Sequence, residues 1–357
     1  MMHMAKLRNK EKNGISLVTG ATTGLGRLLV DKLIANGDEV RVILKSNPKD
    51  DSWDWRNLPP GVIPYAADLT MRRREDEKNL LEACKGINKV YHIAGASYNS
   101  RFSRDELIET NVIGTENLLN KCIESNKSPD SQIHFIYTSS VSVYGYKRGG
   151  APLKEDSEPK PGSNYSESKL MAEHVIQLFS EIHSNITYTI MRLGTLYGPG
   201  YERPSFFKAF RMIRDQKMRY IGRGTNHLTL IHVDDAANAL ALAGKKPIIS
   251  ANNIYNLTDG EPHTVLSLFS SVAKVLNVPP PHSSVNPTIA RLMRKSVNIS
   301  YDEYEFLASD RIVDISKIKR DLGFRPVRSI AIDGMLMVEE FINYSKATES
   351  RNQVNNV

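Results

Sequence analysis

Residues 15–26 read Ile15-Ser16-Leu17-Val18-Thr19-Gly20-Ala21-Thr22-Thr23-Gly24-Leu25-Gly26. The first four residues are typical of a buried strand, and the apolar periodicity of Leu25–Ala35 predicts a helix directly after the glycines. A glycine-rich turn between a strand and a helix is where parallel α/β sheets bind a pyrophosphate. Gly20 would permit the tight turn, Gly24 would let the backbone approach phosphates, and Gly26 would allow close helix packing. A simple strand–helix turn is the alternative interpretation.

Short β-branched runs alternate with amphipathic helical stretches through the first half of the chain. After the first strand, the candidate strands are Val40–Leu44, Val62–Ala66, Val90–Ile93, Ile133–Tyr137 and Tyr188–Arg192. The candidate helices are Leu25–Ala35, Lys78–Cys84, Glu106–Ser125 and Tyr165–Glu181. This alternation predicts an α/β fold with a doubly wound parallel sheet that helices cover on both faces.

The second half of the chain is less regular, and at 357 residues the chain exceeds the usual size of a single core. It predicts a strand at Leu230–Val233, a helix at Asp235–Ala243, and a strand at Asn253–Leu257 that returns to the main sheet. A last helix is expected near Ile330–Tyr344. We expect a main domain of residues 14–195 plus about 226–258, a smaller, mostly C-terminal α/β lobe of about 196–225 plus 259–345, and flexible tails at 1–13 and 346–357.

Composition excludes several classes of protein. The net charge of +7 is spread along the chain, and the basic cluster 72–74 is followed at once by acidic residues, which favours a solvated helix start over a nucleic-acid patch. Two cysteines, Cys84 and Cys122, make no disulfide framework and fit a reducing compartment. Residues 1–13 lack the apolar core of a secretory signal, and no apolar run approaches the roughly 18 residues that span a bilayer. We expect a cytoplasmic protein without nucleic-acid or membrane partners.

The end of the second strand bears on the choice of dinucleotide. In sheets that bind NAD, an acidic residue near this point accepts a hydrogen bond from the adenosine ribose. Here Lys45 stands at the strand end, with Ser46 and Asn47 beside it, while Asp50 and Asp51 lie too far along. A cation suits a 2′-phosphate, so NADP is favoured and NAD is the alternative. The alternative interpretation of Lys45 is a solvent-facing strand end.

Two more strand ends carry candidate ligand contacts. Asp68 follows the third strand and could contact the adenine amino group or cap the next helix. Ala94-Gly95-Ala96 follows the fourth strand with small residues, as expected where a backbone passes close to a ligand.

Tyr165 and Lys169 lie four positions apart, on one face of a predicted helix, with Ser139-Ser140 some way upstream. An ammonium in that place can lower the phenol's pKa and make it a usable acid or base. The pKa would have to fall by about three units, or roughly 4 kcal/mol, to titrate near pH 7. The alternatives are a surface helix pair and, for Ser140, a strand-end turn serine.

Together the motifs resemble the extended short-chain dehydrogenase/reductase family, also called the NAD-dependent epimerase/dehydratase family, over about residues 14–340. In chain order they are the glycine turn, Asp68-Leu69, His92-Ile93-Ala94-Gly95-Ala96, Asn111-Val112-Ile113-Gly114-Thr115, Ser139-Ser140-Val141-Ser142-Val143-Tyr144-Gly145, Tyr165-x-x-x-Lys169, Arg192-Leu193-Gly194-Thr195-Leu196-Tyr197-Gly198-Pro199-Gly200 and Ile231-His232-Val233-Asp234-Asp235. The resemblance implies a Rossmann domain for NAD or NADP and a smaller C-terminal substrate lobe. The cofactor-binding positions would be Gly20, Thr22, Thr23, Gly24, Leu25, Gly26, Lys45, Asp68, Leu69, Ala94, Gly95, Tyr165 and Lys169.

The resemblance also implies roles for the catalytic positions. Tyr165 would be the acid/base, Lys169 would bind the nicotinamide ribose and lower the tyrosine's pKa, and Ser140 would hydrogen-bond the substrate oxygen. Asn111 matches an asparagine that shapes a helix near the active site and can hold a water, with capping or packing as the alternative. His92 and His232 have no second histidine at ligand spacing, so we expect them to be structural and predict no metal site.

Three departures from the family pattern concern the substrate. The glycines are spaced Gly20-x-x-x-Gly24-x-Gly26, as in the compact branch, which leaves the contacts of Thr22 and Thr23 open. Nucleotide-sugar enzymes typically carry an Arg-Asp pair that grips the diphosphate, where this chain has Leu228-Thr229. Thr195 also replaces an asparagine that is common in those enzymes. The candidates for a substitute arginine are Arg203, Arg211 and Arg223.

These departures favour the branch with dihydroflavonol reductases and hydroxysteroid dehydrogenases, as do Gly222-Arg223-Gly224 and Tyr255–Pro262. We expect an NADP-dependent oxidoreductase acting on a ketone or secondary alcohol of a mostly organic small molecule. A nucleotide-sugar 4-epimerase or dehydratase that retains NAD comes second, and a non-catalytic dinucleotide-binding regulator third. Relatives commonly dimerise through a four-helix bundle, which here would use the helices holding Asn111 and Tyr165.

Overall fold

The computed structural model describes residues 14–45, 58–97, 102–128, 130–147, 149–201, 204–297 and 299–354. The expectations for Ser46, Asn47, Asp50, Asp51 and Arg203 fall outside these ranges. Within the ranges, no helix combines the length and the apolar character needed to cross a bilayer.

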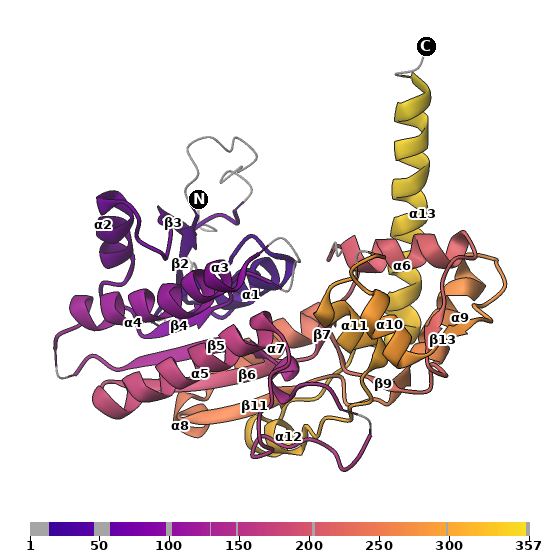
Figure 1. Cartoon of the computed structure of the whole chain (residues 1–357). Coiled ribbons are helices and arrows are strands. Elements are labelled where there is room, and N and C mark those ends of the chain that lie inside the picture. The colour runs from indigo at the N-terminus through magenta and orange to yellow at the C-terminus, as the bar shows by residue number, and fades with distance from the viewer. Residues whose placement is uncertain are drawn as a thin grey trace, which may run out of the picture.

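A parallel sheet forms the centre of the first domain (Figure 1). In the described part of the chain it has seven strands in the order β11-β6-β5-β4-β1-β2-β3, and all their pairings are parallel. The strands are β1 (Ile15–Thr19), β2 (Glu39–Leu44), β3 (Ile63–Ala66), β4 (Lys89–His92), β5 (Ile133–Ser140), β6 (Ile186–Leu193) and β11 (Asn253–Leu257). The predicted return of Asn253–Leu257 to the main sheet is confirmed, because β11 pairs with β6.

Helices cover both faces of this sheet, as expected of a doubly wound fold. Leu17 and Val18 show how: successive side chains of a strand point to opposite faces, and these two lie in different cores. Val18 packs with α1 (Gly24–Ala35) and α7 (Val233–Lys245). Leu17 packs on the face covered by α2 (Arg74–Ala83), α4 (Gly114–Ser125) and α5 (Asn164–Ile182). The predicted Rossmann-type α/β fold is therefore confirmed.

The smaller lobe is built mainly from helices and short strand pairs. Its core gathers aromatic and aliphatic side chains such as Phe210, Phe269 and Phe341. Its helices are α6 (Pro204–Arg214), α9 (Val265–Val275), α10 (Pro287–Met293), α11 (Tyr301–Ala308) and α13 (Ile330–Val354). Its short strands, with the β7–β10 pair at the junction of the domains, are β7 (Thr195–Tyr197), β8 (Tyr220–Ile221), β9 (His227–Leu228), β10 (Leu230–His232), β12 (His263–Thr264) and β13 (Ser284–Val285).

Several boundaries differ from those that the sequence predicted. The helix expected over Glu106–Ser125 is divided into α3 (Arg104–Ile108), a π-helical turn η2 (Glu109–Ile113) and α4. Val233 begins α7 instead of ending a strand, because the side chain of His232 caps the helix. Of the remaining short helices, α12 (Ser316–Leu322) packs in the same core as α1, and α8 (Pro247–Ser250) contacts α7 and α12. Finally, α13 continues through residues that the sequence assigned to a C-terminal tail, and Figure 1 shows it projecting from the lobe.

Candidate active site

The turn between β1 and α1 is closed by its own backbone and by Thr23. Gly20 has φ +74°, and a Cβ there would lie 2.7 Å from the Ala94 nitrogen. A Cβ on Gly26 would overlap the Gly20 carbonyl oxygen. Thr23 Oγ1 accepts a hydrogen bond from the Gly26 N–H at 3.0 Å and donates one to the Gly20 oxygen at 2.9 Å. The turn therefore brings the first N–H groups of α1 beside the end of β4, which fits a pyrophosphate.

The other residues of the turn have different environments. Thr22 is exposed, whereas Leu25 is buried. The ring of Tyr201 covers Gly24, since a Cβ on this glycine would lie 2.7 Å from Tyr201 Cδ2. Tyr201, which directly follows the segment Tyr197-Gly198-Pro199-Gly200, also lines the cavity described below.

Lys45 and Asp68 meet at the carboxyl edge of the sheet. Lys45 Nζ lies 3.2 Å from Asp68 Oδ2, while the other carboxylate oxygen accepts hydrogen bonds from the N–H and hydroxyl of Thr70. Burial raises the pKa of Asp68, but the bonds from Thr70 and the charge of Lys45 outweigh it and hold the pKa below its ordinary value. The Leu69 carbonyl accepts a bond from Asn117, so Leu69 joins this edge to α4.

Asn111 lies in the π-helical turn η2 and ties three elements together. Its Oδ1 accepts a bond from the Ala96 N–H at 2.7 Å, and its Nδ2 donates to the Ala96 oxygen and to Ser168 Oγ. A Cβ on Gly95 would lie 2.9 Å from Asn111 Oδ1 and 3.6 Å from Lys169 Nζ. Asn111 thus fixes the loop after β4 against the helix that carries Lys169.

Lys169 is a buried cation on α5. Only 5% of the residue is exposed, and Nζ lies 4.5 Å from the centroid of the Tyr137 ring, on β5. Burial lowers the pKa of Lys169 to about 7, against the opposing effect of the Glu173 carboxylate one turn further along. The ammonium is therefore poised to lose or keep its proton near neutrality.

Tyr165 and Ser140 lie in the wall of the same cavity as Lys169. Tyr165 is in the first turn of α5, which begins after the N-cap Ser163. Ser140 is the last residue of β5, and its Oγ accepts a hydrogen bond from the Ser142 N–H at 3.1 Å. This bond occupies a lone pair of Ser140 Oγ and leaves its hydrogen available for donation into the cavity.

The cavity has a volume of about 800 Å³ and runs from the end of the sheet into the lobe. Six of the predicted site residues line it: Thr23, Leu25, Gly95, Ser140, Tyr165 and Lys169. The lobe contributes mostly apolar side chains, including those of Phe206, Leu268, Val272, Ile289 and Met293. Asn111 supports the cavity wall through its bond to Ala96. The other predicted residues, Lys45 and Asp68 among them, are not in the cavity lining.

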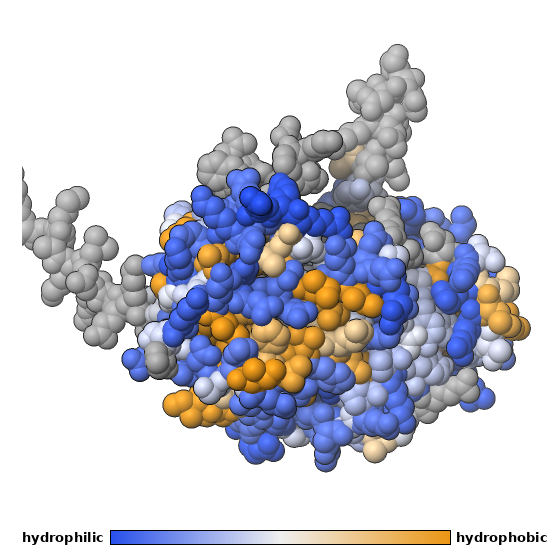
Figure 2. Space-filling view, turned by 60° about the vertical axis from the view of Figure 1, so that its left-hand side comes forward, coloured by the Kyte–Doolittle hydropathy of each residue, from blue (hydrophilic) through white to orange (hydrophobic). Residues whose placement is uncertain are grey.

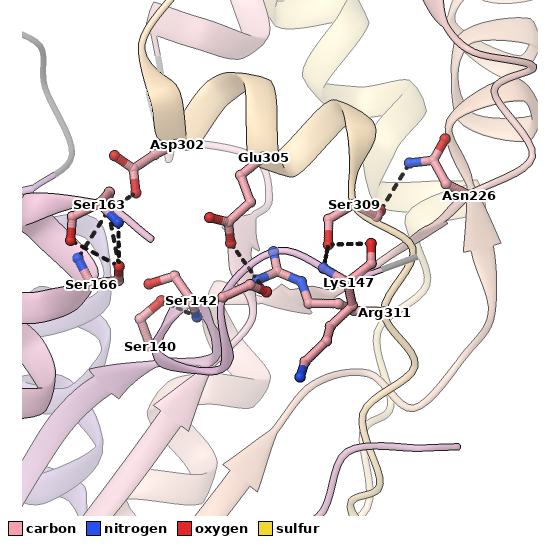
Figure 3. A network of polar contacts seen from close by, with 11 residues as sticks. Ser140, Ser142, Lys147, Ser163, Ser166, Asn226, Asp302, Glu305, Ser309 and Arg311 are labelled. Carbon is pink, nitrogen blue, oxygen red and sulfur yellow. Dashed lines mark hydrogen bonds and ion pairs between the residues drawn. The ribbon is translucent and has the colours of Figure 1, made fainter. Parts of the chain in front are cut away.

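Polar side chains of α11 and of the segment after it face the turn that carries Ser140 (Figure 3). Asp302 accepts a hydrogen bond from Ser163 Oγ at 2.7 Å. Arg311 donates to Glu305 at 2.7 Å and to the Gly145 carbonyl oxygen. Burial raises the pKa of Asp302 to about 6 and raises that of Glu305, while it lowers that of Arg311. No local motif marks these residues, because the fold brings them to Ser140 from more than 150 positions away.

The residues considered for other roles lie elsewhere. Leu228 is buried in β9, and neither Arg211 nor Arg223 lines the cavity. His92 lies between the hydroxyls of Thr19 and Thr115, and burial lowers its pKa to about 3. No group of three potential metal ligands occurs within the described residues.

Comparisons with known proteins agree with this architecture. The model of the NAD dependent epimerase/dehydratase family matches residues 16–258. The chain is 27% identical over 247 residues to sterol-4-alpha-carboxylate 3-dehydrogenase, decarboxylating, of Dictyostelium discoideum, covering 68% of this chain and 71% of the relative. It is 25% identical over 334 residues to sterol demethylase protein B of Methylococcus capsulatus, covering 88% and 95%. The structure of UDP-glucose 4-epimerase of Thermotoga maritima with UDP-glucose has a TM-score of 0.71 and 26% identity, covering 92% and 99%. Several other structures of this fold are complexes with NAD.

Proposed function

Since the chain belongs to the NAD dependent epimerase/dehydratase family, we propose that it is an NAD(P)-dependent oxidoreductase for a ketone or secondary alcohol. The observation that carries this proposal is the shared cavity of Ser140, Tyr165 and Lys169, whose lobe side is mostly apolar. The buried Leu228 at the position of the diphosphate-gripping arginine favours an apolar organic substrate over a nucleotide sugar. The two relatives named for sterol chemistry support the same substrate class.

In this proposal Ser140, Tyr165 and Lys169 have different roles at the substrate oxygen. Ser140 Oγ donates a hydrogen bond to the substrate oxygen and so favours charge that develops there. Tyr165 gives or takes the proton at its phenolic oxygen, and the ammonium of Lys169 stabilises the phenolate form. Asn111 keeps the loop after β4 and the helix of Lys169 in place through Ala96 and Ser168. A nicotinamide bound at this edge of the sheet would supply or accept the hydride.

A turnover experiment tests the proposal. The purified protein is incubated with NADPH and a steroid ketone, and both oxidised cofactor and product alcohol are quantified. We expect equal amounts of the two, because each hydride that leaves the cofactor enters one ketone. Tightly co-purified NAD, together with epimerisation of a UDP-sugar and no net oxidation of cofactor, would replace this proposal with the second candidate.

That second candidate is a nucleotide-sugar 4-epimerase or dehydratase. The likeness to UDP-glucose 4-epimerase favours it, and so does the presence of Arg219 and Arg294 in the cavity wall, where a diphosphate would need cations. A thermal shift with UDP-glucose distinguishes the candidates, since only a nucleotide-sugar enzyme should be stabilised by it. A non-catalytic dinucleotide-binding regulator is third, and it would show no turnover with either substrate class.

We propose NADP as the preferred cofactor because Lys45 lies at the end of β2 and is largely exposed there. Its ammonium could leave Asp68 for the 2′-phosphate, whereas NAD offers it no charge. Lys45→Ala should weaken NADPH binding about five-fold, as expected for roughly 1 kcal/mol from one exposed charge pair. NADH binding should not change. Fluorescence titration of both cofactors measures this, and tighter binding of NADH than NADPH by the unmodified protein would contradict the preference.

We also propose that the protein forms a homodimer through α4 and α5. The outer face of α5 exposes Leu178 and Ile182, at 52% and 64%, one turn apart. Ile113, just before α4, is also exposed. Figure 2 shows apolar patches within a mostly hydrophilic surface on the side of the molecule that carries the first domain. A symmetric pairing of these helices would remove the exposed side chains from water.

A further inference from the structure

The cavity opens to solvent at α10 and the turn that follows it. Ile289, Met293 and Val297 line the cavity, yet their exposed fractions are 50%, 53% and 53%. Leu292, on the same helix, is 77% exposed. We call these four residues the apolar rim. Large apolar side chains gathered at the mouth of a cavity mark a surface that meets something other than water.

The rim lies in a part of the chain that has no negative charge. The sequence contains no Asp or Glu from Pro262 to Tyr301, while it contains the cations Lys274, Arg291, Arg294 and Lys295. Arg294 lies over the Tyr301 ring, 5.6 Å from its centroid, and lines the cavity beside the rim. Further cations in the cavity wall are Lys208, Lys217 and Arg219. Asp302, Glu303 and Glu305 also line the cavity, and Glu305 is paired with Arg311, so the cations outnumber the carboxylates in the wall. The mouth of the cavity is thus apolar with an excess of positive charge.

We infer that the apolar rim docks on an anionic phospholipid surface, and that the substrate is a lipid alcohol or ketone that enters the cavity from the membrane. The second half of this inference rests on the proposed function; the first does not. Apolar side chains flanked by Lys and Arg are the signature of segments that lie in the membrane interface. A protein partner would not explain why the apolar surface continues into the cavity that holds Ser140 and Tyr165.

Continuity between the rim and the cavity gives a physical advantage. A water-insoluble substrate that leaves a bilayer at the rim meets apolar side chains along its path and is never fully exposed to water. The docking would be shallow and reversible, because only a few side chains insert and the cations contact headgroups from above. This inference departs from the sequence-based expectation that the protein has no membrane partner, and the experiment below decides between the two.

Co-sedimentation with vesicles tests the docking, using the full-length protein without cofactor. We expect binding to vesicles of phosphatidylcholine mixed with phosphatidylglycerol, and at least ten-fold weaker binding to phosphatidylcholine alone. Leu292→Glu should reduce binding to the mixed vesicles by at least ten-fold. Arg291→Glu combined with Lys295→Glu should reduce it by a comparable factor, at about five-fold per cation removed.

Ile248→Glu is the matched control. Ile248 is 93% exposed on α8, beside the sheet of the other domain and away from α10 (Figure 1). The Ile248→Glu variant should therefore bind the mixed vesicles as well as the unmodified protein does. No binding to either kind of vesicle, equal binding to both, or equal losses in Leu292→Glu and Ile248→Glu would overturn the inference. The assay involves no turnover, so its failure would leave the proposed hydride transfer intact. Conversely, vesicle binding without ketone reduction would leave the docking intact and overturn the proposed function.

Discussion

At the scale of single residues, Lys169 combines a necessary charge with an unfavourable position. In the proposed mechanism its ammonium favours the phenolate of Tyr165, but burial beside Tyr137 lowers the pKa of Lys169 to about 7. Glu173 offsets the burial only in part. A group held in this way reduces the stability of the folded protein, which is a common property of functional sites.

Lys169→Met should therefore stabilise the cofactor-free protein at pH 7, by up to about 4 kcal/mol, while it abolishes turnover. Between pH 7 and pH 10 the unfolded chain binds a proton at Lys169 that the folded chain lacks, so the free energy of unfolding of the unmodified protein should rise with pH. The variant lacks this contribution, and its advantage should shrink towards zero near pH 10. Urea unfolding of both proteins across this range measures the difference, and parallel pH curves would contradict it.

Tyr165→Phe should reduce turnover by about 10²–10⁴-fold and leave cofactor affinity nearly unchanged, because it removes only the proton-transferring hydroxyl. Tyr137→Phe is the control. The Tyr137 hydroxyl is buried and has no hydrogen-bond partner among the described residues, and the ring under Lys169 is retained. The control should keep its activity. Steady-state rates of the two variants test whether turnover needs the Tyr165 hydroxyl. An active Tyr165→Phe variant would remove Tyr165 from the mechanism.

At the scale of elements, the glycine turn and α1 act as one unit. The turn is tight because Gly20 adopts a positive φ and because Gly26 has no side chain where the Gly20 carbonyl lies. The sequence predicted the strand, the glycine turn and the helix, since each follows from local preferences. The sequence did not predict that a π-helical turn at Asn111 divides the helix expected over Glu106–Ser125. Asn111 bonds to Ala96 and Ser168, which are distant in sequence.

Gly26→Ala should destabilise the protein by about 2 kcal/mol or more and weaken NADPH binding by over ten-fold, because its Cβ would meet backbone atoms that cannot move aside. Gly334→Ala is the matched helical control. Its Cβ would lie 3.3 Å from Ile330 Cδ1, the end of a flexible side chain, so helix propensity should make this change neutral or stabilising by up to about 1 kcal/mol. Thermal unfolding and cofactor titration test the pair, and similar results for both would contradict the role given to Gly26.

At the scale of the whole molecule, the candidate active site depends on the contact between domain and lobe. The lobe residue Asp302 bonds Ser163, the N-cap of the helix that carries Tyr165, and Arg311 bonds the backbone of Gly145, close to Ser140. The cavity is therefore shared by both parts of the chain. The same molecule exposes apolar side chains on α5, which leads to the proposal of a dimer.

Leu178→Glu should convert the dimer to a monomer, because a carboxylate would be buried in the interface without a partner. Light scattering during gel filtration measures the mass of each variant. Leu336→Glu, a change of another partly exposed leucine on α13, should leave the dimer unchanged. An unmodified protein that is already monomeric would rule out the proposed dimer.

The sequence by itself determined the sheet, the glycine turn and the family. Strand periodicity, glycine placement and the spacing of Tyr165 and Lys169 are local features, and such features can be recognised from the sequence alone. It also indicated Ser140, because the segment Ser139–Gly145 resembles the family pattern.

Only the tertiary structure decided the rest. The pairing of Lys45 with Asp68, the desolvation of Lys169, the approach of Arg311 to Gly145 and the apolar rim all require segments that are distant in sequence to meet. The physical reason is that burial and electrostatic interactions depend on distance in space, whereas a sequence pattern records only distance along the chain.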